Sequence, residues 1–343
     1  MKRFLNTLFV TTQKSYLHKE GETVVIKVGK EKKVRLPVIN LQGIVCFGNV
    51  MISPFLMGYC NKKGVTITHL SENGRFLARV QGPVAGNVLL RKEQYRISDD
   101  PSRSAAVAKA IVFGKLSNSR TALQRVLRDH GEKVNAAAIE RAVREMGQAL
   151  DRLQNESDLE VIRGVEGETA RQYFSVFNEM ITIKNADFNF RERNRRPPLD
   201  RVNALLSFIY TLLYHDMRSA AESCGLDPAV GFLHRDRPGR MSLALDLMEE
   251  FRPFFADRLV LSLINLRQVH ARGFSVARNG AVTMDDETRK TVLVAYQSRK
   301  QDVVYHPFVA KKMHIGILFQ IQALLMARFI RGDIDGYPPY FWR

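Results

Sequence analysis

One stretch of the sequence, Ser242–Pro253, constrains the fold more than any other. It reads Ser-Leu-Ala-Leu-Asp-Leu-Met-Glu-Glu-Phe-Arg-Pro. At about 100° per residue, Ser242, Asp246, Glu249, Glu250 and Pro253 of such a helix fall within one wedge. The helix is apolar on most other sides, so we expect it to lie deep in the fold.

The stretch has two interpretations. It is either an amphipathic helix whose polar edge meets water, or a helix whose carboxylates converge with a histidine on a divalent cation. The wedge is acidic in a strongly basic chain, and a glycine-containing segment, Gly231–His234, brings an imidazole close upstream. Both observations favour the cation site, although the helix alone leaves the two interpretations open.

The chain is strongly basic, with 52 Lys and Arg against 35 Asp and Glu and a formal net charge of +17 at pH 7. Such a field favours a polyanionic partner, either nucleic acid or an anionic membrane surface. Residues 1–95 hold 15 of the basic and 5 of the acidic side chains, more than half of the excess. A solvated sheet surface accounts for part of this charge, so charge alone supports nucleic-acid contact only moderately.

The composition indicates a reducing cytoplasm and no membrane span. The cysteines are widely spaced and odd in number, which predicts neither a disulfide framework nor a zinc cluster. They are Cys46, Cys60 and Cys224. The first residues lack the apolar run of a signal peptide. The most apolar stretch, Met313–Phe329, contains polar side chains and is too short to span a bilayer, so we predict a buried helix there.

Two kinds of hydrophobic periodicity divide the chain. Before about residue 95, short segments rich in β-branched and aromatic residues predict strands. They are Phe4–Val10, Thr23–Val28, Lys33–Leu36, Gly43–Phe47 and Val65–Leu70, with a helix expected at Ser53–Cys60. After Ser98–Pro101 the pattern becomes helical. We therefore predict an α+β protein, with a small β-rich N-terminal domain at residues 1–95 and a large all-α C-terminal domain at residues 96–343.

Eight helices are expected in the second domain. They are Ser104–Asp129, Lys133–Gln154, Leu159–Lys184, Leu199–Ser223, 242–251, 254–271, 286–299 and 307–331. The dipeptide Asn279-Gly280 predicts one small hairpin between Phe274 and Met284.

A further carboxylate stands out in the segment Arg163–Glu168. Gly164 and Gly167 lie inside a helical pattern, where each costs about 1 kcal/mol relative to alanine, so close packing or room around Glu166 must compensate. Glu166 shares a helical face with Tyr173, and a carboxylate above a partly buried aromatic stripe needs a partner or a metal. The other interpretation is a glutamate stabilised near a helix N-terminus.

Polar residues also line one face of the apolar helix at Leu199–Ser223, either as an internal hydrogen-bond network or as the wall of a site. They are Asp200, Asn203, Ser207 and Tyr210. The loop before this helix, Phe190–Pro198, carries a cluster of arginines that we expect to be exposed. Phosphate contact is favoured over a solvated connector because guanidinium groups pair with phosphate. The arginines are Arg191, Arg193, Arg195 and Arg196.

Four of these segments, taken in order, resemble the signature blocks of the CRISPR adaptation integrase, the larger subunit of the spacer-acquisition complex. The blocks are Gly164–Gly167, Pro198–Ser207, Gly231–His234 and Ser242–Pro253. The β-then-α layout agrees with the same family. The resemblance is closest to the form found in type I systems.

The resemblance implies a metal site made by Glu166, His234 and Glu249. Asp246 matches a further acidic position that lines the same pocket, and Glu250 remains a rival ligand. Carboxylates with one imidazole suit Mg²⁺ or Mn²⁺. The site would polarise a scissile phosphate and stabilise the leaving 3′ oxygen.

The resemblance also implies a reaction and partners. The 3′-OH of a short captured DNA attacks the CRISPR repeat at each end, and water in its place would make the same site a DNase. Tyr173 and Asn203 are candidates to position the DNA strand or an ordered water. The implied partners are double-stranded DNA with splayed or branched ends, CRISPR repeat DNA, a second copy through the β domain, and a small adaptation subunit that bridges two dimers.

Two other functions compete with this one. A non-catalytic basic nucleic-acid-binding scaffold would pack its acidic wedge against its own arginines. An RNA-processing nuclease would use similar ligands. Loss of DNA integration with EDTA separates catalysis from the scaffold, and competition between DNA and RNA separates the two nucleases.

Overall fold

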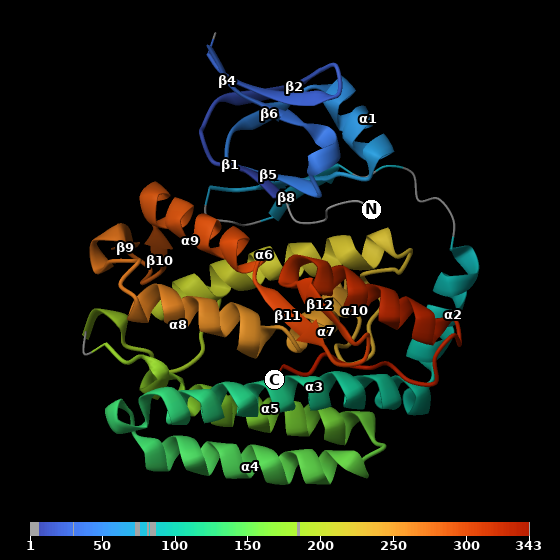
Figure 1. Cartoon of the computed structure of the whole chain (residues 1–343), viewed down its shortest axis with the longest axis vertical. Helices are drawn as coiled ribbons and strands as arrows, with labels where there is room; N and C mark the ends of the chain where they lie inside the picture. The colour runs from blue at the N-terminus through green and yellow to red at the C-terminus, as the bar shows by residue number, and fades with distance from the viewer. Residues whose placement is uncertain are drawn as a thin grey trace. The chain divides into compact units, whose positions relative to one another are not determined.

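The computed structural model describes residues 7–29, 31–72, 76–80, 82, 87–183 and 186–342. The chain forms two compact units (Figure 1). The first comprises Met1–Gly86, Met284–Val303 and His314–Ile317, and the second comprises Asn87–Thr283, Val304–Met313 and Leu318–Arg343. The expected boundary at residue 95 falls inside helix α2 (Val88–Asp99), and residues 284–303 group with the first unit.

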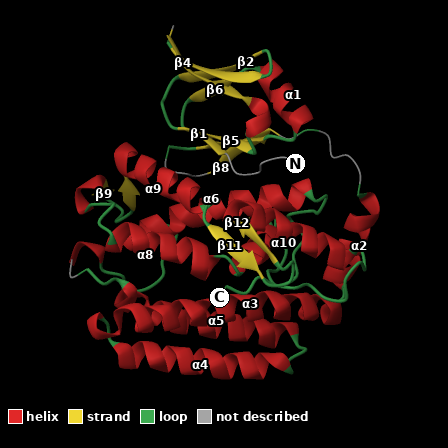
Figure 2. Ribbon diagram, in the orientation of Figure 1, coloured by secondary structure: helices red, strands yellow, loops and turns green. Residues whose placement is uncertain are grey.

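The first unit contains two four-stranded sheets (Figure 2). One has the order β1-β5-β7-β8, in which β1, β5 and β7 are parallel and β8 is antiparallel. The other has the order β4-β3-β2-β6, in which only β2 and β6 are parallel. The strands are β1 (Thr7–Val10), β2 (Ser15–Glu20), β3 (Thr23–Val28), β4 (Glu31–Pro37), β5 (Gly43–Phe47), β6 (Val50–Ile52), β7 (Thr66–Leu70) and β8 (Phe76–Val80).

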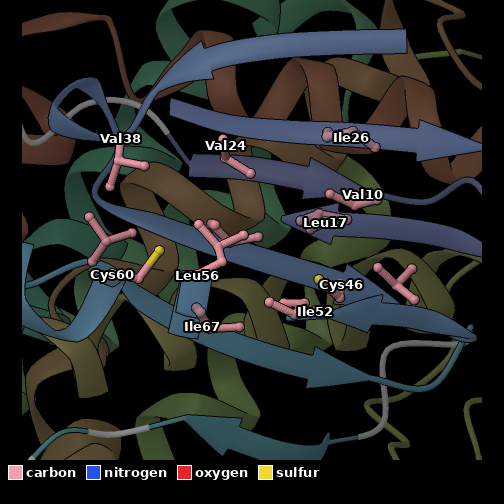
Figure 3. Close-up of a cluster of buried hydrophobic side chains, with 13 residues drawn as sticks. Val10, Leu17, Val24, Ile26, Val38, Cys46, Ile52, Leu56, Cys60 and Ile67 are labelled. Carbon is pink, nitrogen blue, oxygen red and sulfur yellow. The ribbon is translucent and has the colours of Figure 1, made fainter. Parts of the chain in front are cut away.

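Helix α1 (Pro54–Lys63) completes the core of this unit. Its N-terminus is capped by Ser53, whose Oγ accepts a hydrogen bond from the Leu56 N–H, and it ends at Gly64 with a left-handed φ of 69°. Side chains from α1 and from both sheets meet in one apolar cluster that includes Leu17 and Ile67 (Figure 3). Burial of this surface stabilises the unit.

The second unit is helical. Its helices are α2, α3 (Pro101–His130), α4 (Ala136–Gln154), α5 (Leu159–Ser175), α6 (Arg201–Ser223), α7 (Ser242–Glu249), α8 (Arg258–Asn265) and α10 (Ile315–Ile330), whose first turn groups with the first unit. A π-helical turn, η5 (Arg252–Asp257), separates α7 from α8. Helices α3, α4 and α5 pack side by side (Figure 1), and α7 packs against α3 and α6.

The predicted fold class is confirmed: a strand-rich N-terminal region precedes a helix-rich region. Strands β3 and β5 and helix α9 (Asp286–Arg299) have the predicted bounds. The predicted hairpin also forms, with β9 (Phe274–Val276) and β10 (Val282–Met284) as its strands.

Other bounds were wrong. The helix expected over 307–331 begins only at Ile315, because β11 (Val303–His306) and β12 (Lys311–His314) form a hairpin with Ala310 at a φ of 54°. The helix expected over 254–271 divides into η5 and α8 and ends before Arg267, whose φ is also 54°. Strand β2 was not predicted. Its charged residues face solvent and obscure the alternation of apolar and polar side chains that indicates a strand. No helix in the described ranges is long and apolar enough to cross a bilayer.

Candidate active site

Helix α7 and the loop before it form the centre of the site. The Asp246 side chain is fully buried, and its carboxylate accepts hydrogen bonds from the backbone N–H groups of residues 232–234 at 2.6, 3.0 and 3.0 Å. A fourth hydrogen bond of 2.6 Å joins Asp246 Oδ1 to His234 Nδ1. With its acceptor capacity filled in this way, Asp246 orients the histidine and does not line the pocket as a free carboxylate.

Gly231 allows this loop to approach the helix. A Cβ atom there would lie 2.8 Å from Asp246 Oδ2 and 2.8 Å from the backbone carbon of Ser242. Real Cβ atoms do not come so close to other heavy atoms, so any side chain would push the loop away from α7. The glycine thereby supports the orientation of His234.

The hydrogen bond to Asp246 fixes the orientation and the tautomer of the His234 ring. A carboxylate only accepts, so Nδ1 carries the hydrogen, and in the neutral ring the lone pair lies on Nε2. Nε2 lies 3.7 Å from Glu249 Oε1, one helical turn after Asp246. Residues predicted from separate segments of the sequence are therefore neighbours in space.

Lys115, on α3, connects Glu166, the third residue predicted for the site, to Glu249 and His234. Its Nζ atom contacts Glu166 Oε1, from α5, and lies 2.7 Å from Glu249 Oε2. The lysine side chain is 10% exposed, the Glu166 side chain 26% and the Glu249 side chain 1%. Burial opposes the ammonium charge, but Glu249 and Glu166 outweigh it and raise the pKa of Lys115.

Glu249 is a buried carboxylate surrounded by cations. Arg252 NH1 lies 2.9 Å from its Oε1 atom, and Lys115 contacts its Oε2 atom. Burial alone would raise the pKa of Glu249, but Arg252, Lys115 and His234 lower it to about 2. The side chain is therefore ionised at neutral pH, as a metal ligand must be.

Glu250 faces away from this group, which removes it as a rival ligand. Its carboxylate accepts hydrogen bonds from the hydroxyl of Tyr337, the backbone N–H of Tyr340 and Nε2 of Gln322, the last at 3.0 Å. All of these come from α10 or the C-terminal segment. Burial raises the pKa of Glu250 to about 7, and among the residues that the structure describes no cation lowers it as Lys115 and Arg252 do for Glu249.

A cavity of about 530 Å³ opens beside the Lys115–Glu166 pair, within the second unit. Most of its charged wall is basic. The basic residues are Lys115, Arg171, Arg191, Arg193, Arg195 and Arg252. Gly167 also lines it, and a Cβ at Gly164 or Gly167 would meet no atom within 4 Å, so these glycines are not needed for close helix packing. Such a cavity suits a phosphate-bearing ligand.

Tyr173, Tyr210 and Asp257 also line the cavity. The Tyr210 hydroxyl donates a hydrogen bond of 2.6 Å to Asp257 Oδ1. Burial raises the pKa of Asp257 to about 6 in spite of that bond. Burial, followed by the Asp257 charge, raises the pKa of both tyrosines well above the usual value. The Tyr173 side chain is thus a neutral hydroxyl in the cavity wall.

The arginine loop is only partly exposed. Arg191, Arg195 and Arg196 are exposed, whereas Arg193 turns inward over the Tyr210 ring, 5.3 Å from its centroid. Burial lowers the pKa of Arg193. This contact explains why one of the four side chains does not remain on the surface.

Asn203 holds this loop from a buried position. It is fully buried, donates a hydrogen bond of 2.8 Å to the Glu192 carbonyl, and accepts one of 2.7 Å from Arg193 NH1. These hydrogen bonds anchor the loop, and a role in positioning the DNA strand or an ordered water stays a prediction. The face is an internal network at this point.

The sequence reasoning missed Lys115, Arg252 and Asp257. Lys115 lies on α3, far in sequence from every predicted ligand, and nothing in its segment distinguishes it from an exposed lysine. Arg252 was part of the acidic segment, and its spacing of three residues from Glu249 was the available signal. Within the described ranges, no group of three His, Cys, Asp or Glu side chains has metal-site geometry.

Comparison with known proteins identifies the class first. The fold matches a solved Cas1 protein from Thermotoga maritima with a TM-score of 0.80 and 22% identity, over 95% of this chain and 97% of that one. It also matches a casposase bound to integration product, with a TM-score of 0.84 and 21% identity, over 98% of this chain and 94% of the other. At these identities the likeness establishes the fold.

The family follows from closer relatives. The model of the family described as CRISPR associated protein Cas1 matches residues 8–298. A CRISPR-associated endonuclease Cas1 from Chlorobaculum tepidum is 57% identical over the full length of both chains. The chain belongs to the Cas1 family. The resemblance and the predicted enzyme class, a CRISPR-associated DNA endonuclease and integrase, are thereby confirmed.

Proposed function

We propose that this protein uses a divalent metal ion, held by Glu166, His234 and Glu249, to join the 3′ ends of short DNA fragments to CRISPR repeat DNA. The observation that carries the proposal is the convergence of these residues. His234 Nε2 lies 3.7 Å from Glu249, and Glu249 and Glu166 share the Lys115 ammonium. Contacts thus link side chains from α5, the loop before α7, and α7 itself.

The donor set fits a hard divalent cation. Two carboxylates and one imidazole suit Mg²⁺ or Mn²⁺, and Mn²⁺ accepts the nitrogen more readily. The two carboxylates already share one cation in Lys115. When bound, the metal would polarise the scissile phosphate and stabilise the leaving 3′ oxygen.

The protein side chains supply orientation and charge. Asp246 holds His234 with Nε2 directed at the site, and Arg252 keeps Glu249 ionised. The basic cavity beside Glu166 would hold the phosphates of the strand that carries the 3′-OH. The hydroxyl oxygen attacks the phosphorus of the repeat while the bond to the repeat's 3′ oxygen breaks. The number of phosphodiester bonds is unchanged, and water as the attacking group would give cleavage.

The proposed partners follow the family and the charge. We place double-stranded DNA with splayed ends and CRISPR repeat DNA on the basic surface, and a homodimer contact on the β-rich unit. A small adaptation subunit would bridge two dimers. Two solved structures with related folds are described as a Cas6-RT-Cas1–Cas2 complex and a casposase bound to integration product, which supports both a protein partner and DNA. The net charge of +17 predicts steeply salt-dependent DNA binding.

The RNA-processing nuclease remains the second candidate, because the same ligands would act on RNA. A non-catalytic scaffold fits less well, since Glu166, which shares the Lys115 ammonium with Glu249, is partly exposed and lines the basic cavity. Integration and cleavage assays with branched DNA, in the presence of competing RNA and with or without EDTA, distinguish the three.

A paired substitution on α5 tests the site. Glu166→Gln removes one proposed ligand, and the matched control Glu168→Gln neutralises a carboxylate on the same helix that pairs with exposed Arg152. We expect Glu166→Gln to abolish strand joining while DNA binding and folding persist, and Glu168→Gln to behave like the unsubstituted protein. Full strand joining by Glu166→Gln would contradict the proposal.

A further inference from the structure

The Lys115 ammonium lies where a shared cation would be held. Its Nζ atom contacts Glu166 and is 2.7 Å from Glu249 Oε2, and both contacts come from carboxylates on different helices. The lysine side chain is only 10% exposed, so solvent screens these contacts weakly. It is thus a full positive charge between the two oxygen ligands of the proposed metal site.

We propose that Lys115 is a resident cation of the metal-free protein, which holds Glu166 and Glu249 together and which a divalent ion must displace in order to bind. The inference rests on the proposed metal site. It makes Lys115 a competitor of the metal, not a ligand and not merely a structural ion-pair partner.

The electrostatics of the site require such a cation. Two carboxylates brought to one point repel each other, and the Glu249 side chain is only 1% exposed. An uncompensated charge in that position is strongly destabilising. Arg252 lies 2.9 Å from Glu249 Oε1 and attracts Glu166 only through space, whereas Lys115 contacts both carboxylates. Lys115 alone bridges the two helices among the contacts of the described residues.

The same geometry shows how the lysine can leave. An ammonium is a compact charge on a flexible four-carbon stem with three rotatable donors, so it can move without rearranging α3. Lys115 also lines the basic cavity of about 530 Å³, which provides space for the displaced side chain. Metal binding then exchanges one cation for another between the same two carboxylates.

The test measures metal affinity and thermal stability, with three variants. Lys115→Met keeps the length of the side chain and removes its charge. Lys115→Arg keeps the charge, and Lys109→Met is the control, which removes a half-buried lysine of the same helix whose ammonium donates to the Gln154 carbonyl. Free Mn²⁺ is followed by electron paramagnetic resonance during titration of the full-length protein, and melting temperatures are recorded in EDTA and in Mn²⁺.

We expect Lys115→Met to bind Mn²⁺ about tenfold more tightly or better, because the competing charge has gone. It should melt at a lower temperature than the unsubstituted protein in EDTA and gain more from Mn²⁺. Lys115→Arg and Lys109→Met should not bind Mn²⁺ more tightly. If Lys115→Met folds only in the presence of Mn²⁺, the proposal is supported as well.

Two results would overturn the inference. The first is an unchanged or weaker Mn²⁺ affinity in Lys115→Met, confirmed with Lys115→Gln, which keeps hydrogen-bond donors for the carboxylates. The second is an equal gain in affinity in Lys109→Met, which would reflect net charge alone. In both cases the metal site itself survives. Failure of the unsubstituted protein to bind Mn²⁺, or binding that Glu166→Gln leaves unaltered, would contradict the proposed function too.

Discussion

Glu249 and Glu250 are consecutive residues, yet they lie in two regions of the second unit that shift the pKa of a buried carboxylate in opposite directions. Glu249 faces Lys115, Arg252 and His234, and its pKa is lowered to about 2. Glu250 is fully buried on the other side of α7, and its pKa is raised to about 7. Both carboxylates are buried, so burial alone does not explain the difference.

The neighbours make the difference. The partners of Glu249 are charged, so its carboxylate stays ionised. Lys115 and Arg252 also border an open cavity, so these partners can be exchanged. The partners of Glu250 are neutral donors from α10 and the C-terminal segment, which bind the carboxylate in place. A cation site needs the first kind of surroundings, and a structural anchor needs the second.

The largest expected difference in strand joining is between the glutamine variants of Glu249 and Glu250. Glu249→Gln should reduce strand joining by roughly a hundredfold to a thousandfold, the usual loss when one preorganised electrostatic contact to a transition state is removed. Glu250→Gln should retain joining per folded molecule. Rates on a branched DNA substrate at saturating Mn²⁺ measure both. Equal losses in the two variants would show that the two regions do not differ in function.

A smaller loss is expected from the residue that orients His234. Asp246→Asn leaves a weaker acceptor for His234 Nδ1, so we expect metal affinity or strand joining to fall about tenfold to a hundredfold. The matched control is Asp236→Asn, an exposed carboxylate in the same loop. Mn²⁺ titration and joining rates measure the effect. No change in Asp246→Asn would mean that the ring is held by other contacts.

The structural role of Glu250 is tested by measuring stability. Tyr337→Phe removes the hydroxyl that donates to Glu250 and also accepts a hydrogen bond of 2.9 Å from Gln322. The free energy of unfolding should fall by about 1–3 kcal/mol, because buried polar groups lose a partner. Denaturant titration measures it. Strand joining at a temperature where the variant is folded should be unchanged, and a selective loss of joining would contradict the division of roles.

The smallest effect concerns the pH dependence of stability at Asp257, in the cavity wall. Its pKa is raised to about 6, so the protonated form is favoured in the folded state. The stability it contributes is therefore complete below the ordinary aspartate pKa of about 4 and is lost as the pH rises through about 6. Asp257→Asn should flatten this part of the stability–pH profile. An unaltered profile would show that another group titrates there.

The sequence predicted those parts of the molecule that local patterns determine. Strand β3 and helix α9 have their expected bounds because β-branched runs and helical periodicity are local signals. The acidic positions at α7 were recognisable for the same reason, and the structure buries all three carboxylates, but it directs Glu250 away from Asp246 and Glu249.

The remaining features depend on contacts between distant segments. Lys115 reaches Glu166 and Glu249 only once α3, α5 and α7 have packed. The difference between Glu249 and Glu250 could not be predicted either, because the donors to Glu250 lie in the C-terminal segment. The inward turn of Arg193 depends on the Tyr210 ring beneath it. Periodicity carries no information on such pairs.

The most direct test of the central claim is the position of a divalent ion in a crystal of the protein soaked with Mn²⁺. An anomalous-difference map should show a peak within about 2–2.5 Å of side-chain atoms of Glu166, His234 and Glu249, the range for hard cations. Glu250 should remain bound to the C-terminal segment, with no ion beside it. A peak at Glu250, or none at the three residues in a Mn²⁺-saturated crystal, would contradict the account.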